Sequence, residues 1–150
     1  MWLWKRTLAA RKAFMASRSP LPDTQFAHIV GARDDDLWLV AAIRRTIAER
    51  CGVPAELLYP TDELANLETM MGSYGLLGCI FLSDIMWCRW EPNMFYGGLV
   101  RVLKGHHVKI RRLSMSEAER ELPVWASRDE GGYGNLGEWI IAAASVLKIQ

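Results

Sequence analysis

Apolar residues recur at helical spacing between residues 37 and 51. Val40, Ile43 and Ile47 form one stripe, and the charged side chains of the segment fall elsewhere on the helical wheel. These charged residues are Arg44, Arg45, Glu49 and Arg50. The pattern predicts an amphipathic helix over 37–51 that packs its stripe against a core and leaves its charges in solvent.

Start and stop signals bound this helix. The acidic residues at 34–36 supply a cap and place negative charge at the positive end of the helix dipole. Gly52 is the C-terminal stop, and Pro54 prevents continuation. Residues 53–72 are then expected to form a long loop, pinned to the core by leucines. These leucines are Leu57, Leu58, Leu64 and Leu67.

Two later segments carry capping signals of the same kind. Ser114 and Glu117 form a capping box that predicts a short helix through Glu121, which Pro123 closes. Asn135 repeats this logic before a last helix, whose buried residues are spaced by four, three and four. These buried residues are Leu136, Ile140, Ala143 and Leu147.

The N-terminal stretch from 2 to 17 has helical composition and is basic, without an acid. Pro20 and Pro22 break it, and a second short helix over 23–30 follows, with Asp23 as its cap. A basic segment with two tryptophans can lie on an anionic membrane as a peripheral contact. The alternatives are a helix packed on the domain, or a frayed terminus.

Two middle segments are harder to interpret. The apolar stretch at 74–90 is too short and too charged to span a membrane, and its run from Leu76 to Trp87 predicts a buried helix. Segment 93–113 fits a helix that Asn93 caps and Gly105 ends, with apolar residues on one face. It also fits a hairpin, in which apolar and charged residues alternate on both sides of a turn at Lys104-Gly105. Local pattern leaves both open. The apolar face of the helix would hold Phe95, Leu99, Val102 and Leu103.

Composition narrows the class of protein. A chain of 150 residues, 51% hydrophobic and 23% charged, fits a single globular domain with an extension. Its net charge of +1 gives no overall attraction to nucleic acid or membrane. Three cysteines, an odd number without close pairing, favour a reducing compartment. We therefore expect a cytoplasmic, all-α protein without a secretion signal or transmembrane segment.

The order of these elements carries a family resemblance. Residues 47–58 and the loop at 60–64 resemble the first helix and loop of acyl carrier proteins. Residues 103–110 are similar to the end of that family's second helix, 116–121 to its short third helix, and 135–147 to its last. The resemblance implies a small helical bundle over 31–150, with an inserted apolar helix. Residues 1–30 form a basic helical extension in this scheme.

In that family, the serine of an Asp-Ser-Leu triplet carries a 4'-phosphopantetheine arm. This sequence has no such triplet. Counting forward from Gly52 places the equivalent position at Ser73, whereas counting back from Ile110 places it near Pro92. An insertion of the apolar segment 74–90 reconciles the two counts. Ser73 is thus the candidate attachment residue that the resemblance implies.

We expect a non-catalytic, carrier-like module that docks to partner proteins without the arm and without a cofactor. One alternative is an active acyl carrier loaded at Ser73. The other is a nucleic-acid-binding protein that uses a local basic run, although this run lacks interleaved aromatic residues for base stacking. A solvated face, or a patch for an acidic protein partner, fits the run better than nucleic acid does. The run comprises Lys104, His106, His107, Lys109, Arg111 and Arg112.

Other chemistry finds little support. The candidate metal ligands lack the cysteine spacing of zinc sites, so we expect no metal site. They are Cys51, Cys79, Cys88, His106 and His107. No nucleophile has a recognisable signature, and the paired acids Asp62 and Glu63 read as solvated loop charge, which argues against an enzyme. Among the seven tryptophans, Trp125 is expected to be partly exposed, as are Trp2 and Trp4, whereas Trp87 and Trp90 are expected in the core.

Overall fold

The computed structural model describes residues 2–71, 92–106, 109–125 and 132–149. In these ranges all regular secondary structure is helical and no strand forms, apart from one isolated antiparallel bridge between Glu63 and Asn135. The expectation of an all-α protein is confirmed. The helices are α1 (Trp2–Ala16), α2 (Asp23–Ile29), η1 (Asp34–Asp36), α3 (Leu37–Cys51), η2 (Ala55–Leu57), α4 (Leu64–Met71), α6 (Pro92–Leu103), α7 (Met115–Glu121) and α8 (Leu136–Leu147).

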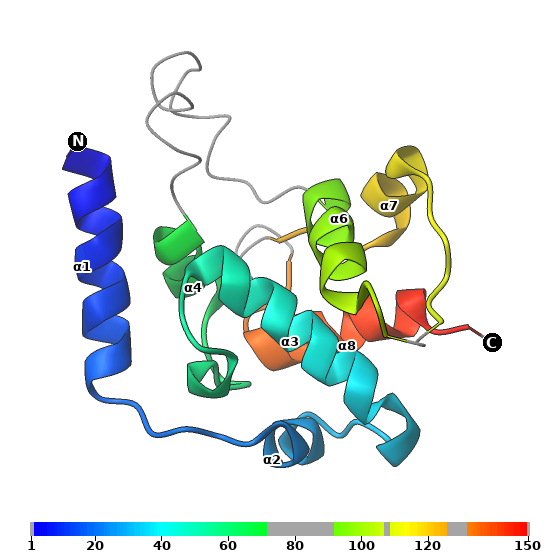
Figure 1. Cartoon of the computed structure of the whole chain (residues 1–150), viewed down its shortest axis with the longest axis horizontal. Coiled ribbons are helices and arrows are strands. Elements are labelled where there is room, and N and C mark those ends of the chain that lie inside the picture. Colours follow the sequence, from blue (N-terminus) through cyan, green and yellow to red (C-terminus); the bar gives the residue numbers. More distant parts are fainter. Residues whose placement is uncertain (1, 72–91, 107–108, 126–131, 150) are drawn as a thin grey trace.

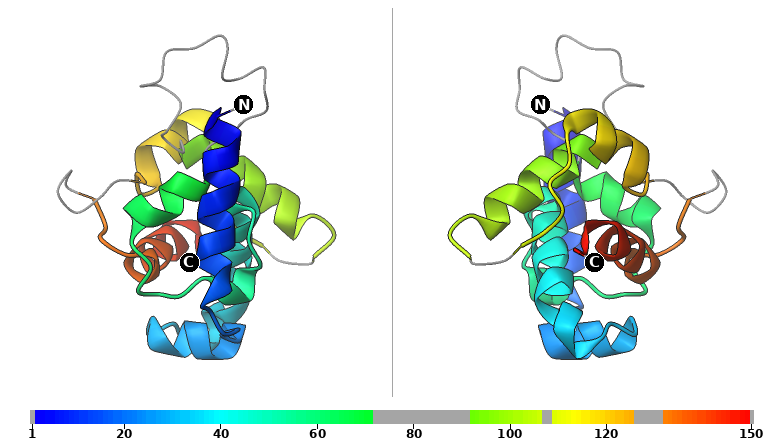
Figure 2. Two further views of the ribbon diagram at one scale, coloured as in Figure 1. Left: turned by 90° about the vertical axis from the view of Figure 1, so that its left-hand side faces the viewer. Right: turned by 90° about the vertical axis from the view of Figure 1, so that its right-hand side faces the viewer.

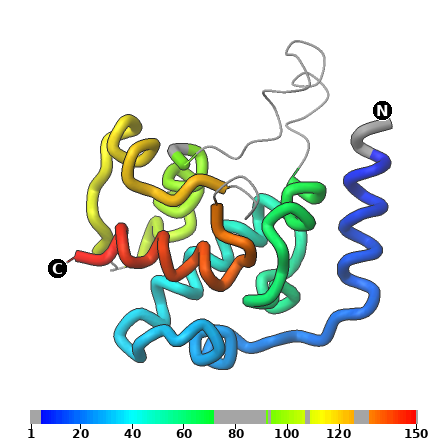
Figure 3. Tube along the Cα trace, turned by 180° about the vertical axis from the view of Figure 1, so that it is seen from behind, coloured from blue at the N-terminus to red at the C-terminus, as the bar shows by residue number. Residues whose placement is uncertain are grey.

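Helix α3 occupies the centre of the molecule (Figure 1). It contacts α2, α4, α6 and α8, while α7 packs on α6. Helix α1 stands at one edge beside α4 and is joined to α2 by an extended linker (Figures 1 and 3). The arrangement is therefore a bundle around α3 with an N-terminal helix on its flank.

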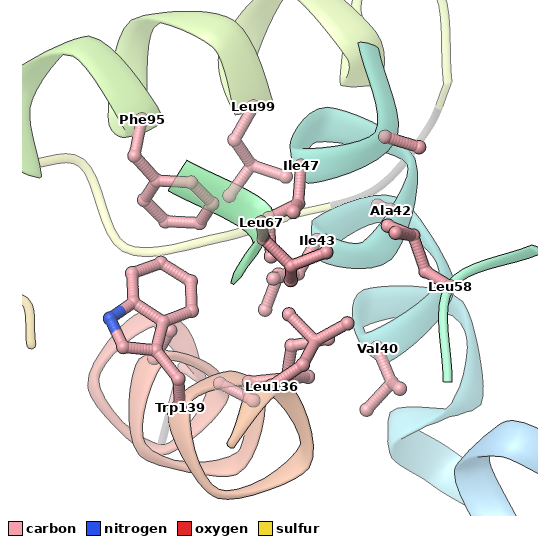
Figure 4. Close-up of a cluster of buried hydrophobic side chains, with 14 of the residues drawn as sticks. Val40, Ala42, Ile43, Ile47, Leu58, Leu67, Phe95, Leu99, Leu136 and Trp139 are labelled. Atoms are coloured by element: carbon pink, nitrogen blue, oxygen red, sulfur yellow. The ribbon is translucent and has the colours of Figure 1, made fainter. Parts of the chain in front are cut away.

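The interior forms where the apolar stripe of α3 meets α6 and α8 (Figure 4). Ile43 and Ile47 have no exposed surface, as the sequence predicts. Phe95 meets the indole of Trp139 edge-on, with ring centroids 4.9 Å apart. Trp125 also packs on Trp139 at 5.1 Å and is only 3% exposed, so the expectation that it is partly exposed is wrong. These aromatic contacts join the C-terminal half of the chain to the core.

Arg44 departs from the expected solvent-facing charges of α3, because its side chain is completely buried. Its Nη1 atom donates to Oδ1 of Asp23 at 2.8 Å. Its Nη2 atom donates to the carbonyl oxygens of Leu21 at 2.9 Å and Leu58 at 2.8 Å. Its guanidinium also lies 4.3 Å from the ring centroid of Phe26. Burial lowers the pKa of Arg44, and the hydrogen bond and charge of Asp23 oppose this shift.

The predicted loop at 53–72 is corrected in two respects. It contains η2 and a true helix, α4, whose Leu64 and Leu67 are buried. Asp62 is not solvated, since only 7% of it is exposed. Arg18 forms a bidentate ion pair with Asp62, with N–O distances of 2.6 and 2.8 Å. The Asp62 carboxylate also accepts a hydrogen bond from the amide of Tyr59 at 2.7 Å.

Helix α1 packs on the domain, which confirms one of the three readings of the N-terminal segment. Arg11 donates from Nη2 to the carbonyl oxygen of Met70 at 2.9 Å, at the C-terminal end of α4, where a cation is favoured. The predicted stop at Gly52 is confirmed by its left-handed φ of 70°. A Cβ on Gly52 would lie 2.6 Å from the Arg11 guanidinium, so a larger residue here would force the Arg11 side chain to shift.

Three of the expected caps are wrong. Asp36 makes no capping hydrogen bond and instead binds Lys148, with Nζ–Oδ1 at 2.8 Å, which joins the start of α3 to the end of α8. Asp23 is the first residue of α2, and its carboxylate serves Arg44. Asn93 lies inside α6, because Pro92 takes the first helical position, where a missing N–H costs nothing.

The other caps are confirmed. The Ser114 hydroxyl accepts from the Glu117 amide at 3.2 Å, and the Glu117 carboxylate accepts from the Ser114 amide at 2.7 Å. These bonds to Ser114 lower the pKa of Glu117. Asn135 caps α8 by accepting from the Glu138 amide at 2.9 Å.

Segment 93–113 adopts the helical alternative. Helix α6 ends at Leu103, and Gly105 turns the chain with a φ of 87°. Residues 109–113 then run back without regular structure. The apolar run at 74–90 and its two tryptophans lie outside the described residues. No helix in the described ranges has both the length and the apolar content to cross a bilayer.

We predict that Arg44→Met lowers the free energy of unfolding by about 2–4 kcal/mol, because the buried carbonyl oxygen of Leu58 and the partly buried one of Leu21 lose their donor. Urea unfolding followed by circular dichroism measures the change. The matched control is Arg45→Met, since Arg45 is the exposed neighbour on α3 and should change stability by less than about 0.5 kcal/mol. Equal effects of both variants would contradict the assigned role of Arg44.

Candidate functional site

An open groove of about 1180 Å³ lies between α6 and residues 109–113. In the right-hand view of Figure 2, residues 109–114 pass beside α6 on their way to α7, on the face turned to the viewer. Volume and openness suit a segment of a macromolecule better than an enclosed small ligand. The groove is lined by Tyr96, Gly97, Val100, Arg101, Leu103, Lys104, Lys109, Ile110, Arg111, Arg112, Leu113 and Ile149. We call it the basic groove.

Helical spacing on α6 separates the core-facing residues from the groove-facing ones. Phe95 and Leu99 point into the interior and are fully buried. The next row, at spacings of four and three, holds Tyr96, Val100 and Leu103 and lines the basic groove. One helix therefore supplies both core and groove with apolar side chains.

The opposite wall of the groove is fastened by the hydroxyl of Tyr96. This hydroxyl donates to the carbonyl oxygen of Arg111 at 3.1 Å and accepts from the amide of Leu113 at 3.0 Å. Arg111 adds an ion pair to Glu121 at 2.8 Å, and its amide donates to the carbonyl oxygen of Leu147 at 2.9 Å. The wall is thus tied to α6, α7 and α8 together.

Positive charge on the rim is largely uncompensated. The side chains of Lys104, Lys109 and Arg112 are exposed, and none of them makes an ion pair or hydrogen bond with a described residue. Arg101 has only a 3.8 Å contact with Glu49, between two exposed side chains, and such pairs contribute little. None of the lining residues is acidic. The groove consequently favours a negatively charged occupant.

The groove also exposes apolar surface. Val100 is 47% exposed and Ile149 is 50% exposed, and both line it. Covering either side chain would stabilise a complex by roughly 1 kcal/mol. An exposed ion pair on the rim contributes about 0.2–1 kcal/mol. Affinity would therefore come mainly from the apolar floor, while the rim charges would set specificity and speed of association.

The residues singled out in the sequence fall in different places. Ser73, the candidate attachment residue, lies outside the described residues, two positions after the end of α4. The basic run does reach one surface, with Arg111 pinned and Lys109 and Arg112 free. His106 is exposed in the turn after α6, and His107 lies outside the described residues.

Cys51 is a core residue. Its side chain has no exposed surface, and its thiol approaches the carbonyl oxygen of Leu67 at 3.9 Å. Burial raises its pKa to about 12, which keeps the thiol protonated and unreactive at neutral pH. Within the described ranges, no three His, Cys, Asp or Glu side chains are grouped to hold a metal ion. Cys79 and Cys88 lie outside those ranges.

Comparison of the chain with protein-family models, curated proteins and solved structures found no significant match.

Sequence reasoning identified the basic run but missed its apolar complement. Tyr96, Val100 and Ile149 complete the groove, and Gly97 leaves its α6 wall bare. The exposed position of Val100 follows from helical spacing once Phe95 and Leu99 are assigned to the core. The contribution of Ile149 had no signal in the sequence, because it depends on the tertiary position of the C-terminus.

We predict that Tyr96→Phe destabilises the fold by about 1 kcal/mol, because the Leu113 amide and the Arg111 carbonyl lose their partner. Amide exchange across 109–114 should accelerate, as measured by hydrogen–deuterium exchange mass spectrometry. Tyr133→Phe is the control, since Tyr133 is exposed and its hydroxyl makes no hydrogen bond with the described residues. Unchanged exchange at 109–114 in Tyr96→Phe would show that the hydroxyl does not hold this wall.

We predict that the Cys51 thiol resists iodoacetamide at about pH 8 in the folded chain, because the reactive thiolate is a minute fraction when the pKa is near 12. Unfolding in guanidinium should restore the rate of an ordinary cysteine. Peptide mass spectrometry of timed samples resolves Cys51 from the other two cysteines. Rapid labelling of folded Cys51 would refute the assigned burial.

Proposed function

We propose that this chain is a non-catalytic, carrier-like docking module of the cytoplasm that binds an acidic partner protein through the basic groove. The carrying observation is an apolar floor, with Val100 and Ile149 exposed, inside a rim whose cations lack acidic neighbours in the groove lining. An exposed apolar surface rimmed by polar groups is typical of a protein interaction site.

The fastened wall supports docking over a merely solvated charged face. The Tyr96 hydroxyl and the Arg111 ion pair fix residues 109–113 in place before any partner arrives. A surface that is already ordered loses less conformational entropy on binding. The conformational cost of holding Lys109 and Arg112 together on this wall is therefore met in the free protein.

The carrier-like part of the proposal is supported by the helix order, and the arm is left out because the Asp-Ser-Leu triplet is absent. Nucleic acid is the second candidate, since free cations on one surface also favour phosphate. Two features count against it. The aromatic residue in the groove lining is Tyr96, whose hydroxyl is engaged with the wall, and the floor is apolar. The groove lining therefore offers no platform for base stacking.

We predict that a photo-crosslinking residue in place of Val100 captures a discrete acidic protein in the native cell. The same residue in place of Ile29, which is 58% exposed but outside the groove, should not capture it. The captured protein, once purified, should bind the chain directly, with affinity that falls as salt increases because exposed charges are screened. Isothermal titration calorimetry at several salt concentrations measures this.

Charge reversal supplies the matched control. Lys104→Glu, Lys109→Glu and Arg112→Glu together should abolish capture. Lys12→Glu, Arg33→Glu and Arg45→Glu make the same change of net charge on exposed residues outside the groove and should leave capture intact. Docking through the groove would be refuted if neither triple variant changed the yield of cross-linked protein. It would also be refuted if the cross-linker at position 29 in place of Ile29 captured the same protein equally well. Cross-linking to RNA or DNA would instead establish the second candidate. A mass gain of one phosphopantetheine that disappears in Ser73→Ala would establish a loaded carrier.

A further inference from the structure

We propose that the occupant of the basic groove is an acidic amphipathic helix of the partner protein, which crosses α6 at Gly97. This inference rests on the proposed docking function and specifies the chemistry and shape of the partner. It depends on three features of the groove: a bare glycine in mid-helix, two rows of side chains at helical spacing, and a second wall whose backbone is already engaged.

Nothing in the described part of the chain requires residue 97 to be glycine. It is the sixth residue of α6, its φ is not positive, and a Cβ there would meet no described atom within 4 Å. Glycine in a helix interior is less favourable than alanine, so its presence at an exposed position calls for an external cause. Gly98 differs, because its Cβ would lie 3.1 Å from Cγ2 of Thr46 on α3. Gly98 thus serves the packing of α6 on α3, whereas Gly97 serves the outer face.

The side chains around Gly97 match a helix laid along the groove. Gly97, Arg101 and Lys104 form a row at spacings of four and three, next to the apolar row that contains Val100. Removing the Cβ at the head of this row lets a second helix approach α6 closely. An apolar stripe on that helix would cover Val100 and Ile149.

Charge complementarity decides the chemistry of the occupant. Arg101 and Lys104 stand on the α6 side of the groove, and Lys109 and Arg112 stand on the opposite wall. A helix with acidic residues on both flanks of its apolar stripe would meet cations on each side. From residue 96 to its end at residue 103, α6 rises about 10 Å, so the occupant needs about two turns, or about 7–8 residues, to fill the groove.

The groove favours a helix over the other occupants of similar charge. A strand would need free backbone groups on 109–113, but the Arg111 amide and carbonyl and the Leu113 amide are already hydrogen-bonded. An anionic membrane presents a broad surface, which cannot enter a concave groove to reach its floor. A nucleic acid would leave the apolar floor uncovered and gain no stacking from it.

To test this inference, a phage-displayed library of random peptides is screened for binding to the immobilised full chain. The peptides have about 16 residues, which is long enough for four helical turns. We expect the recovered peptides to be acidic, to repeat apolar residues at helical spacing, and to gain helical circular dichroism when bound. Their affinity, measured by fluorescence anisotropy, should fall about tenfold in Gly97→Ala and further in Gly97→Leu, because each side chain blocks the crossing point. Arg112→Glu should also weaken binding, and Arg45→Glu is the control that should not.

The same glycine variants have an opposite effect on the fold, which separates blocked binding from misfolding. Gly97→Ala should raise the midpoint of thermal unfolding by about 2–4 °C, since alanine favours the helix and meets no described atom. A variant that is more stable yet binds less tightly cannot be explained by damage to the domain.

Several results would overturn the inference. The screen could recover no peptides, or only basic or proline-rich ones. The recovered peptides could also bind Gly97→Leu as tightly as they bind the unmodified chain. Binding of single-stranded RNA or of phosphatidylserine vesicles that Gly97→Leu abolishes would assign the groove to that other class of ligand. If capture at Val100 persists while any of these results is obtained, the helical occupant alone is refuted. Loss of capture as well refutes the docking function beneath it.

Discussion

A buried guanidinium group holds together parts of the chain that are distant in sequence. Arg44 lies on the central helix, and its partners are Asp23 on α2, the carbonyl of Leu21 in the linker and the carbonyl of Leu58 in the loop. The hydrogen bonds and the opposite charge around a buried cation offset its removal from water. The linker, α2 and the loop each supply a partner to the Nη atoms of Arg44, whereas its Nε atom is buried without a hydrogen-bond partner among the described residues.

The position of the groove follows from the way α6 packs on the same central helix. Gly98 lets α6 approach Thr46 closely, and the stripe of α6 that enters the core is narrow. The neighbouring row therefore remains outside and becomes a wall. Arg111 and Arg112 show how a single residue step separates roles in the facing wall. Arg111 turns back to bind Glu121 and α8, whereas Arg112 makes no such contact and stays available.

Features governed by short-range contacts were readable in the sequence. The stop at Gly52, the capping box at Ser114 and the cap at Asn135 each depend on residues three or four positions away. Features governed by distant partners were not readable. Arg44 and Asp62 read as solvated charges, because burial of each depends on a partner at least 21 residues away. Helix α4 escaped notice since a segment of eight residues is too short for its periodicity to stand out.

The candidate site divides along the same line. Its cations are clustered in the sequence and were recognised as a basic run that suits an acidic protein. Its floor is formed by α6, residues 109–113 and Ile149 near the C-terminus. No local sequence pattern predicts that these three segments lie side by side. In the sequence, Gly97 only lowers the helix propensity of α6. Its exposed position in the groove depends on how α6 packs in the folded chain.

The attachment of the N-terminal segment has a consequence for how the molecule responds to salt. The fully buried apolar side chains of the described chain begin at Phe26, and the described apolar residues of α1 that join them, Ala10, Phe14 and Met15, are only partly buried. Polar links at Arg11 and Arg18 do much of the remaining fastening. The N-terminal segment is thus held by polar contacts and partly buried apolar residues, in contrast to the fully buried interior of the bundle. Because the Asp62 side chain is only 6% exposed, salt screens its ion pair with Arg18 less than it screens an exposed pair, and this link between the N-terminal segment and the bundle persists as ionic strength rises.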